Sequence, residues 1–361
     1  MTVTSTPYGR LDGDQVVLLR LRAGAMEAAV TTFGARLVEL WAPDRDGRSA
    51  DVVLGLGDLA TYRRAPGSLG ATVGRVANRI AAATFVLDGV RYRLPANEPP
   101  NHLHGGDVGF GARNWSIVEV GSGTGTARVQ LALISADGDQ GYPGRVEARV
   151  SYELGADGRL QVVMAATTDA PTVVNLAHHA YWNLAGHDAG TVLDHVVEVT
   201  ADAYTPMGAD QLPTGEVVSV TGTAYDLRSP SRLADRFAML DHDRGYDDNW
   251  LLRGPRGTLH PAASVVHPAS GRRLRLTATE PALQVYTAAH LNGSLRGKGG
   301  TRYPRFAGVA LETQTCPDAP NRPAFPSARL DPGERYEHRM VFTLDTVGIS
   351  PNAPTVRSGR R

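Results

Sequence analysis

The residues best suited to chemistry lie in the stretch Val173–Gly186, which reads VVNLAHHAYWNLAG. Its pattern is typical of a buried strand, in which successive side chains point to opposite faces. One face then holds Asn175, Ala177, His179, Tyr181 and Asn183. The other, largely apolar face holds Val174, Leu176, His178, Ala180, Trp182 and Leu184. Because buried polar groups need hydrogen-bonding partners or a ligand, we expect His179 to face a polar site and His178 to lie in the core.

Two glycine-rich loops offer further polar side chains. The segment GRVANRI carries Asn78 and Arg79, and the segment NHLHGGDVGF carries His102 and His104. The second loop permits either a polar ligand site that uses His104 or a cupin-like metal site that uses both histidines. No aspartate-rich or cysteine ligand set accompanies the histidines, so the sequence predicts no metal.

Three more residues are polar within apolar surroundings. Glu312 lies in the middle of the predicted strand in VALETQ, where a carboxylate costs free energy unless it is paired or used. Gln284 interrupts the apolar strand in PALQVY, and Asp247 lies in the turn GYDDNW. Hydroxyl-binding amides and carboxylates of this kind suit a sugar ligand. A histidine and a carboxylate on opposite walls of a site also supply an acid and a base for proton transfer.

Strands must position these groups, because alternation is the recurrent pattern of the chain. Residues 145–154 alternate cleanly between apolar and charged side chains, and Asp88-Gly89 between two short apolar runs indicates a type I′ hairpin. The only helical pattern is short, at Leu233–Leu240. We therefore predict an all-β fold, a large antiparallel β-sandwich with few short helices. Gly293–Pro304, rich in glycine, is expected to be a flexible loop.

Composition restricts the class of protein. The 361 residues include 37 basic and 37 acidic side chains, a balance that does not favour a nucleic-acid or anionic-membrane partner. The single cysteine excludes an intramolecular disulfide, and no apolar run approaches a membrane span. We expect a cytoplasmic protein, a monomer or weak homodimer, with one domain over residues 1–346 and a flexible tail over 347–361.

These motifs together resemble the aldose 1-epimerase (galactose mutarotase) family. The resemblance is carried, in order, by GRVANRI, NHLHGG, VNLAHHAYWNLAG, GYDDNW, PALQVYTAAHLNG and LETQTCPDAPNRPAFPS followed by L-x-PGE-x-Y, which span about residues 70–345. It implies a large β-sandwich that interconverts the α and β anomers of free aldohexoses without cofactor or metal.

The resemblance also implies residue roles. His179 would protonate the ring oxygen as general acid, and Glu312 would remove the anomeric hydroxyl proton as general base. The acid must then begin protonated and the base ionised. The residues expected to bind sugar hydroxyls are Asn78, Arg79, His104, Tyr181, Asp247 and Gln284, and we also count His104 with the catalytic residues.

The sequence departs from the usual family motifs at His178, Ala180 and Asp248, where the family has Asn, Ser and His. No acid, base or binding group is lost, but the preferred aldose is left open. A carbohydrate-binding protein, an inverting glycoside hydrolase using Asp247 and Glu312, and a hexose-6-phosphate epimerase remain as alternatives. The last would need a basic cluster for the phosphate, and the sequence shows no second arginine beside Arg79.

Overall fold

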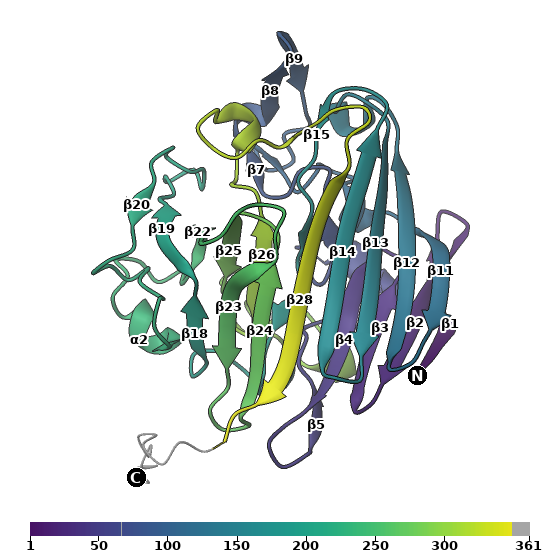
Figure 1. The fold of residues 1–361 in the computed structure, drawn as a ribbon, viewed down its shortest axis with the longest axis vertical. Helices are drawn as coiled ribbons and strands as arrows, with labels where there is room; N and C mark the ends of the chain where they lie inside the picture. The colour runs from purple at the N-terminus through teal and green to yellow at the C-terminus, as the bar shows by residue number, and fades with distance from the viewer. Residues whose placement is uncertain (66, 349–361) are drawn as a thin grey trace.

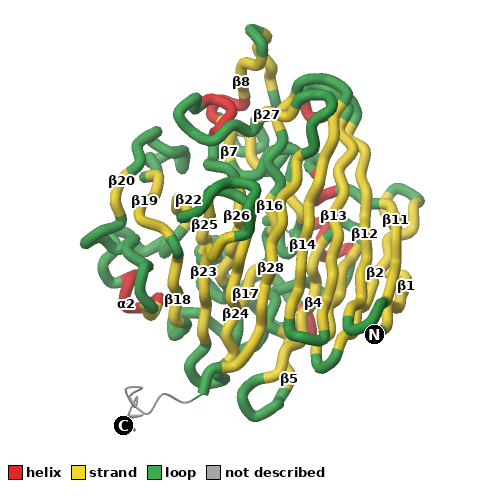
Figure 2. Tube along the Cα trace, viewed as in Figure 1, coloured by secondary structure: helices red, strands yellow, loops and turns green. Residues whose placement is uncertain are grey.

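The computed structural model of the protein describes residues 1–65 and 67–348. Strands dominate the described chain, as Figure 2 shows, and its two α-helices are short: α1 (Leu59–Arg64) and α2 (Leu233–Phe237). Asp58 begins α1 by accepting a hydrogen bond from the Thr61 amide in its first turn. The prediction of an all-β fold with few short helices is confirmed.

The largest sheet has nine strands, in the order β11-β12-β13-β14-β28-β24-β23-β18-β21. Neighbouring strands pair antiparallel throughout this sheet. Their bounds are β11 Ser116–Ser122, β12 Thr126–Ser135, β13 Val146–Gly155, β14 Arg159–Thr168, β18 Val196–Val199, β21 Ser231–Arg232, β23 His260–Val266, β24 Arg272–Ala278 and β28 Tyr336–Thr346.

Two smaller antiparallel sheets form the second layer. The five-stranded sheet consists of β1 (Thr2–Leu11), β2 (Asp14–Ala23), β3 (Met26–Thr31), β4 (Arg36–Pro43) and β5 (Ser49–Asp51). The six-stranded sheet has the order β17-β26-β25-β22-β19-β20. Its strands are β17 (Tyr181–Trp182), β19 (Ala201–Thr205), β20 (Val218–Ser219), β22 (Asp247–Leu252), β25 (Ala282–Tyr286) and β26 (Val309–Gln314).

Short pairs of strands and single turns of 3₁₀-helix shape the loops. The pairs are β6 (Thr72–Val73) with β16 (Ala177–His178), β7 (Arg79–Ile80) with β10 (His102–Leu103), β8 (Thr84–Leu87) with β9 (Val90–Arg93), and β15 (Thr172–Val173) with β27 (Arg329–Leu330). The 3₁₀ turns are η1 (Ala81–Ala83), η2 (Phe110–Ala112), η3 (Asp139–Gly141), η4 (Lys298–Gly300) and η5 (Ala319–Asn321). The predicted hairpin at Asp88-Gly89 is confirmed, since it joins β8 to β9 with φ of 50° and 79°.

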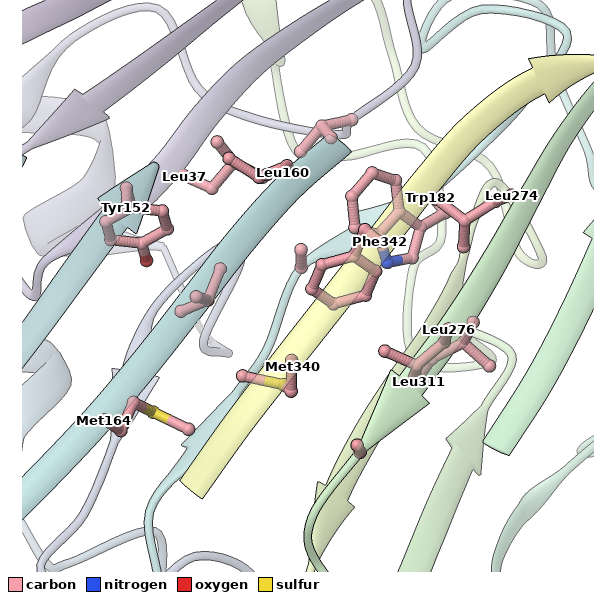
Figure 3. Close-up of a cluster of buried hydrophobic side chains, with 14 of the residues drawn as sticks. Leu37, Tyr152, Leu160, Met164, Trp182, Leu274, Leu276, Leu311, Met340 and Phe342 are labelled. Carbon is pink, nitrogen blue, oxygen red and sulfur yellow. The ribbon is translucent and has the colours of Figure 1, made fainter. Parts of the chain in front are cut away.

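The hydrophobic core lies between the two layers. In Figure 1 the purple strands β1–β4 lie against the teal strands β11–β14, and contacts join β2 to both β12 and β13. Figure 3 shows Trp182 of the six-stranded sheet beside Phe342 of β28, with ring centroids 4.9 Å apart. The apolar face of each sheet is therefore buried, and the opposite face of the six-stranded sheet is left for polar side chains.

The stretch Val173–Gly186 differs from the single strand that the sequence predicts. It forms three two-residue strands, β15, β16 and β17, each paired with a different partner. Between them, the backbone of His179 bonds to loop residues, donating to Ala71 O at 2.8 Å and accepting from Gly70 N at 2.9 Å. The segment stays extended, so the alternation of its side chains survives although no continuous ladder forms.

Two further predictions concern the ends of the fold. Most of the tail predicted at 347–361 lies outside the described residues, because 349–361 are not described. In the described part of the chain, no helix is long and apolar enough to cross a membrane.

Candidate active site

A cleft of about 490 Å³ opens on the polar face of the six-stranded sheet. Register places its residues on that face: Glu312 of β26 lies opposite Gln284 of β25, and Tyr286 of β25 lies opposite Asp247 of β22. Side chains directly opposite in an antiparallel pair point to the same face. Tyr181 of β17 joins them, and the loops around β7 and β10 close the cleft with Asn78, Arg79 and His104.

His179 and Glu312 meet in this cleft. The His179 Nε2 and Glu312 Oε1 atoms are 3.5 Å apart, and both residues are at least 96% buried. Burial lowers the pKa of His179 to about 3 and raises the pKa of Glu312 well above its usual range. Desolvation therefore opposes both charges that the family resemblance implies, a protonated His179 and an ionised Glu312.

His104 stands against His179, with the two rings edge to face and their centroids 5.2 Å apart. The backbone N–H of Asn78 donates to the ring atom His104 Nδ1 at 3.1 Å, and the backbone N–H of His104 donates to the carbonyl oxygen of Asn78 at 3.1 Å. Both residues adopt left-handed backbone conformations, with φ of 62° and 52°. Burial lowers the pKa of His104 and so favours the neutral ring. Because Nδ1 accepts a hydrogen bond from Asn78, the proton of the neutral ring lies on Nε2, which can donate.

Arg79 is held as a flat donor at the edge of the cleft. Its Nε and Nη2 atoms donate to the two carboxylate oxygens of Glu98 at 2.5 and 2.9 Å, and Nη2 also donates to Gln211. A bidentate pair fixes the plane of the guanidinium. Arg79 therefore presents its remaining donors in one orientation.

Gln284 lies beneath Asp247 and is not among the residues that line the cleft. Its Nε2 donates to Asp247 Oδ1 at 2.8 Å. Burial raises the pKa of Asp247, while Arg79 and this hydrogen bond lower it. Gln284 thus holds Asp247 in place, and its expected contact with sugar stays a prediction.

Several polar residues of the sequence motifs lie outside the cleft. His178 is fully buried beside Tyr152 and Phe342, as its place on the apolar face predicts, and burial lowers its pKa to about 3. Asn175 and Asn183 share a face with His179 in the sequence, but they bond to backbone groups of Thr315 and of Ala307. The His102 ring bonds to Tyr142 Oη and Pro95 O, away from His104.

The cleft also contains residues that the sequence analysis did not single out. They are Glu98, Gln211, Arg244, Tyr286, His290 and Arg305. Tyr286 and His290 belong to the PALQVYTAAHLNG motif. Strand alternation could have found Tyr286, which shares a face of β25 with Gln284, but not His290, which lies beyond the end of that strand. Arg244 and Arg305 come from loops without periodicity, so only folding brings them to the cleft.

A metal ion is a chemical possibility at the His179–Glu312 pair. His104, His179 and Glu312 each place one ligand atom so that all three lie within 4.8 Å of one another. Two imidazoles and a carboxylate are a donor set found in zinc sites. The metal site considered from the sequence used His102 with His104, but the His102 ring bonds to Tyr142 and Pro95 instead.

The fold is similar to that of solved structures of aldose epimerases. The chain superposes on galactose 1-epimerase from Lactobacillus acidophilus NCFM with a TM-score of 0.83 and 27% identity, covering 96% of this chain and 99% of that one. It superposes on an aldose epimerase homologue from C. elegans with a TM-score of 0.82 and 32% identity, covering 91% and 97%. The fold and its polar cleft define the galactose mutarotase-like class of β-sandwich proteins.

Sequence comparison gives the family. The profile of the aldose 1-epimerase family matches residues 17–343. The chain is 41% identical to galactose mutarotase from Homo sapiens over 348 residues, 96% of this chain and 99% of that protein. It is 36% identical to aldose 1-epimerase from Escherichia coli (strain K12), covering 92% and 96%. The protein belongs to the aldose 1-epimerase family and is an isomerase.

Proposed function

We propose that this protein interconverts the α and β anomers of free aldohexoses of the glucose and galactose type. The observation that supports this most strongly is the His179–Glu312 pair, an imidazole and a carboxyl group that are both buried and lie 3.5 Å apart in a polar cleft. Mutarotation consists of moving one proton onto the ring oxygen O5 and another off the anomeric hydroxyl O1. An acid and a base side by side supply both transfers.

Substrate binding prepares the pair. The O1 hydroxyl donates a hydrogen bond to Glu312, and O5 accepts one from His179, so the sugar favours the ionised carboxylate and the protonated imidazole. His179 then protonates O5 while Glu312 removes the O1 proton, the C1–O5 bond breaks, and the aldehyde rotates about C1–C2. Closure on the other face reverses both transfers and restores the pair.

The remaining residues hold the part of the sugar that does not rotate. His104 donates from Nε2, Arg79 donates from its fixed guanidinium, and Asp247 accepts from hydroxyls. Tyr181, whose ring stacks on that of His179 with centroids 4.9 Å apart, closes the wall behind the reacting atoms. Held at one end, the opened sugar is free to turn only near C1, which is the motion the reaction requires.

Polarimetry of freshly dissolved α-D-glucose and α-D-galactose tests the function, with and without EDTA. We expect the protein to accelerate mutarotation equally in both conditions. Acceleration that disappears with EDTA would instead favour a metal held by His104, His179 and Glu312. Binding of either sugar without acceleration would favour a carbohydrate-binding protein, and acceleration confined to hexose 6-phosphates would favour the phosphate-specific alternative.

We further propose that residues 1–346 act as one domain, supported by a hydrophobic cluster that joins β2 to β28. The remaining expectations from the sequence are also proposals: a cytoplasmic location, a monomer or weak homodimer, no nucleic-acid or membrane partner, and no cofactor.

A further inference from the structure

A second hollow of about 420 Å³ adjoins the cleft. His290 lines both, so the two spaces share a wall. The hollow is built by the last turn of α1 and by the loop that follows His290. Arg64 contributes from α1, and Arg296 and Arg302 contribute from the loop.

This hollow is strongly basic. None of its described lining residues is acidic, although the whole chain is electrically balanced. Some exposed arginines elsewhere pair with carboxylates, as Arg253 does with Asp202 and Arg329 with Asp88. The three arginines of the hollow form no ion pair with any described carboxylate. Arg302 Nη1 donates to Gly293 O at 2.9 Å, which orients this guanidinium and leaves its other donors for a ligand.

The loop holds two of these charges face to face. Arg296 and Arg302 are partners in an isolated antiparallel bridge, a position in which like charges repel. The loop is nevertheless anchored: the Lys298 ammonium is buried against Asp51, Val38 O and Val53 O, and the Tyr303 hydroxyl donates to Gly55 O at 2.8 Å. The segment Gly293–Pro304, which the sequence predicts to be flexible, is thus anchored through Lys298 in its middle and Tyr303 near its end. It carries the guanidinium groups of Arg296 and Arg302 on two paired stretches of backbone.

His290 lies between the cleft and the hollow and lines both. Tyr286 Oη and His290 Nδ1 are 2.5 Å apart, which fixes the imidazole, and its ring centroid lies 6.3 Å from that of Tyr181. Gly67 lines the cleft next to His290, and a β-carbon there would stand 3.3 Å from His290 Nε2. A larger residue at Gly67 would therefore crowd the imidazole.

We propose that the hollow formed by Arg64, Arg296 and Arg302 is an anion subsite, which takes a phosphate or carboxylate substituent of a sugar whose reducing ring lies in the cleft. Guanidinium groups bind both anions through paired hydrogen bonds. The inference rests on the proposed function for the ring in the cleft. It assigns to this chain a basic cluster that sequence inspection around Arg79 did not find, because Arg64 is some 230 residues from Arg296 and Arg302 along the chain.

Mutarotation rates of α-D-glucose, glucose 6-phosphate and glucuronate test the subsite. In the double variant Arg296→Gln/Arg302→Gln we expect kcat/KM for at least one anionic sugar to fall about tenfold, the loss of a charge-assisted contact. For glucose it should change less than about twofold, because no arginine of the hollow reaches the cleft. Which anionic sugar responds shows whether phosphate or carboxylate is the ligand. Arg64→Gln should act in the same direction, and Arg63→Gln, an exposed neighbour outside the hollow, is the matched control.

Calorimetric titration with inorganic phosphate and with glucuronate provides a readout that does not need catalysis. Binding of at least one should weaken in the double variant and persist in Arg63→Gln. Equal changes in kcat/KM for glucose and both anionic sugars overturn the inference, as does anion binding that survives the double substitution. If wild-type protein accelerates no sugar, the proposed function fails, and the calorimetric comparison still decides whether the anion site exists.

Discussion

Replacing Glu312 by glutamine should separate catalysis from folding. The amide keeps the size of the side chain, 3.5 Å from His179, but cannot accept a proton from the anomeric hydroxyl. A positioned acid–base group contributes about 10²–10⁴-fold to the rate, which is about 3–5.5 kcal/mol of activation free energy. We expect polarimetry to show a fall in kcat of this size, with KM changed little because Asp247, Arg79 and His104 are intact.

The same substitution should leave the fold more stable at neutral and alkaline pH. Burial raises the pKa of Glu312 above its value in the unfolded chain, so the folded protein holds this proton more tightly. Wild-type stability is complete below the unfolded pKa and is lost as pH rises toward the folded pKa, by about 1.4 kcal/mol for every tenfold difference in proton affinity. Glu312→Gln has no such loss, so denaturant unfolding should show equal stabilities near pH 4 and a more stable variant at pH 8.

Glu280→Gln is the matched control. Like Glu312, Glu280 is buried, with only 1% of its surface exposed, and burial raises its pKa to about 7. It lies outside the cleft beside Arg256. It should shift the pH dependence of stability in the same direction and leave kcat unchanged. The reasoning is refuted if Glu312→Gln retains much more than about a hundredth of wild-type kcat, because a positioned acid–base group contributes at least about 10²-fold. A variant that is inactive and also less stable at pH 8 would contradict the raised pKa of Glu312.

Three other predictions concern protonation, substrate positioning and loop anchoring. Because burial lowers the pKa of His179 to about 3, kcat/KM plotted against pH should begin to fall on the acid side only well below pH 6.5. An inflection near pH 6.5 that disappears in His179→Asn would contradict this. Gln284→Leu removes the 2.8 Å hydrogen bond to Asp247. Because one hydrogen bond to a charged group is lost, KM should rise about tenfold with a smaller change in kcat. Steady-state kinetics that show only a change in kcat would contradict a positioning role. Lys298→Met leaves Asp51 buried without its cation and should destabilise the protein by about 3–5 kcal/mol in urea unfolding. Adding Asp51→Asn should recover part of this stability. No recovery would show that the loss does not come from the unpaired carboxylate.

Periodicity predicted much of this fold because it acts locally. Alternation in 145–154 identified β13 within a residue at each end, and Asp88-Gly89 identified the β8–β9 hairpin from its backbone requirement alone. The same rule distinguished His179 from His178, since adjacent residues of an extended chain must face opposite ways. That distinction survived although the segment pairs with three different partners, because extended backbone requires only local geometry.

The sequence by itself determined which residue types were available, which face of each strand they occupy, and the family to which the motifs belong. Only the tertiary structure decided which polar residues meet a ligand: Asn175 and Asn183 share a face with His179, yet they bond to backbone groups of distant loops. It also decided the direction in which the pKa values of His179 and Glu312 shift, since both shifts follow from burial, a property of the packed surroundings. Likewise, Arg64 gains two cationic neighbours only when α1 and a loop more than 200 residues away are folded together. Strand periodicity extends over a few residues, whereas desolvation and charge clustering depend on every element packed around a site.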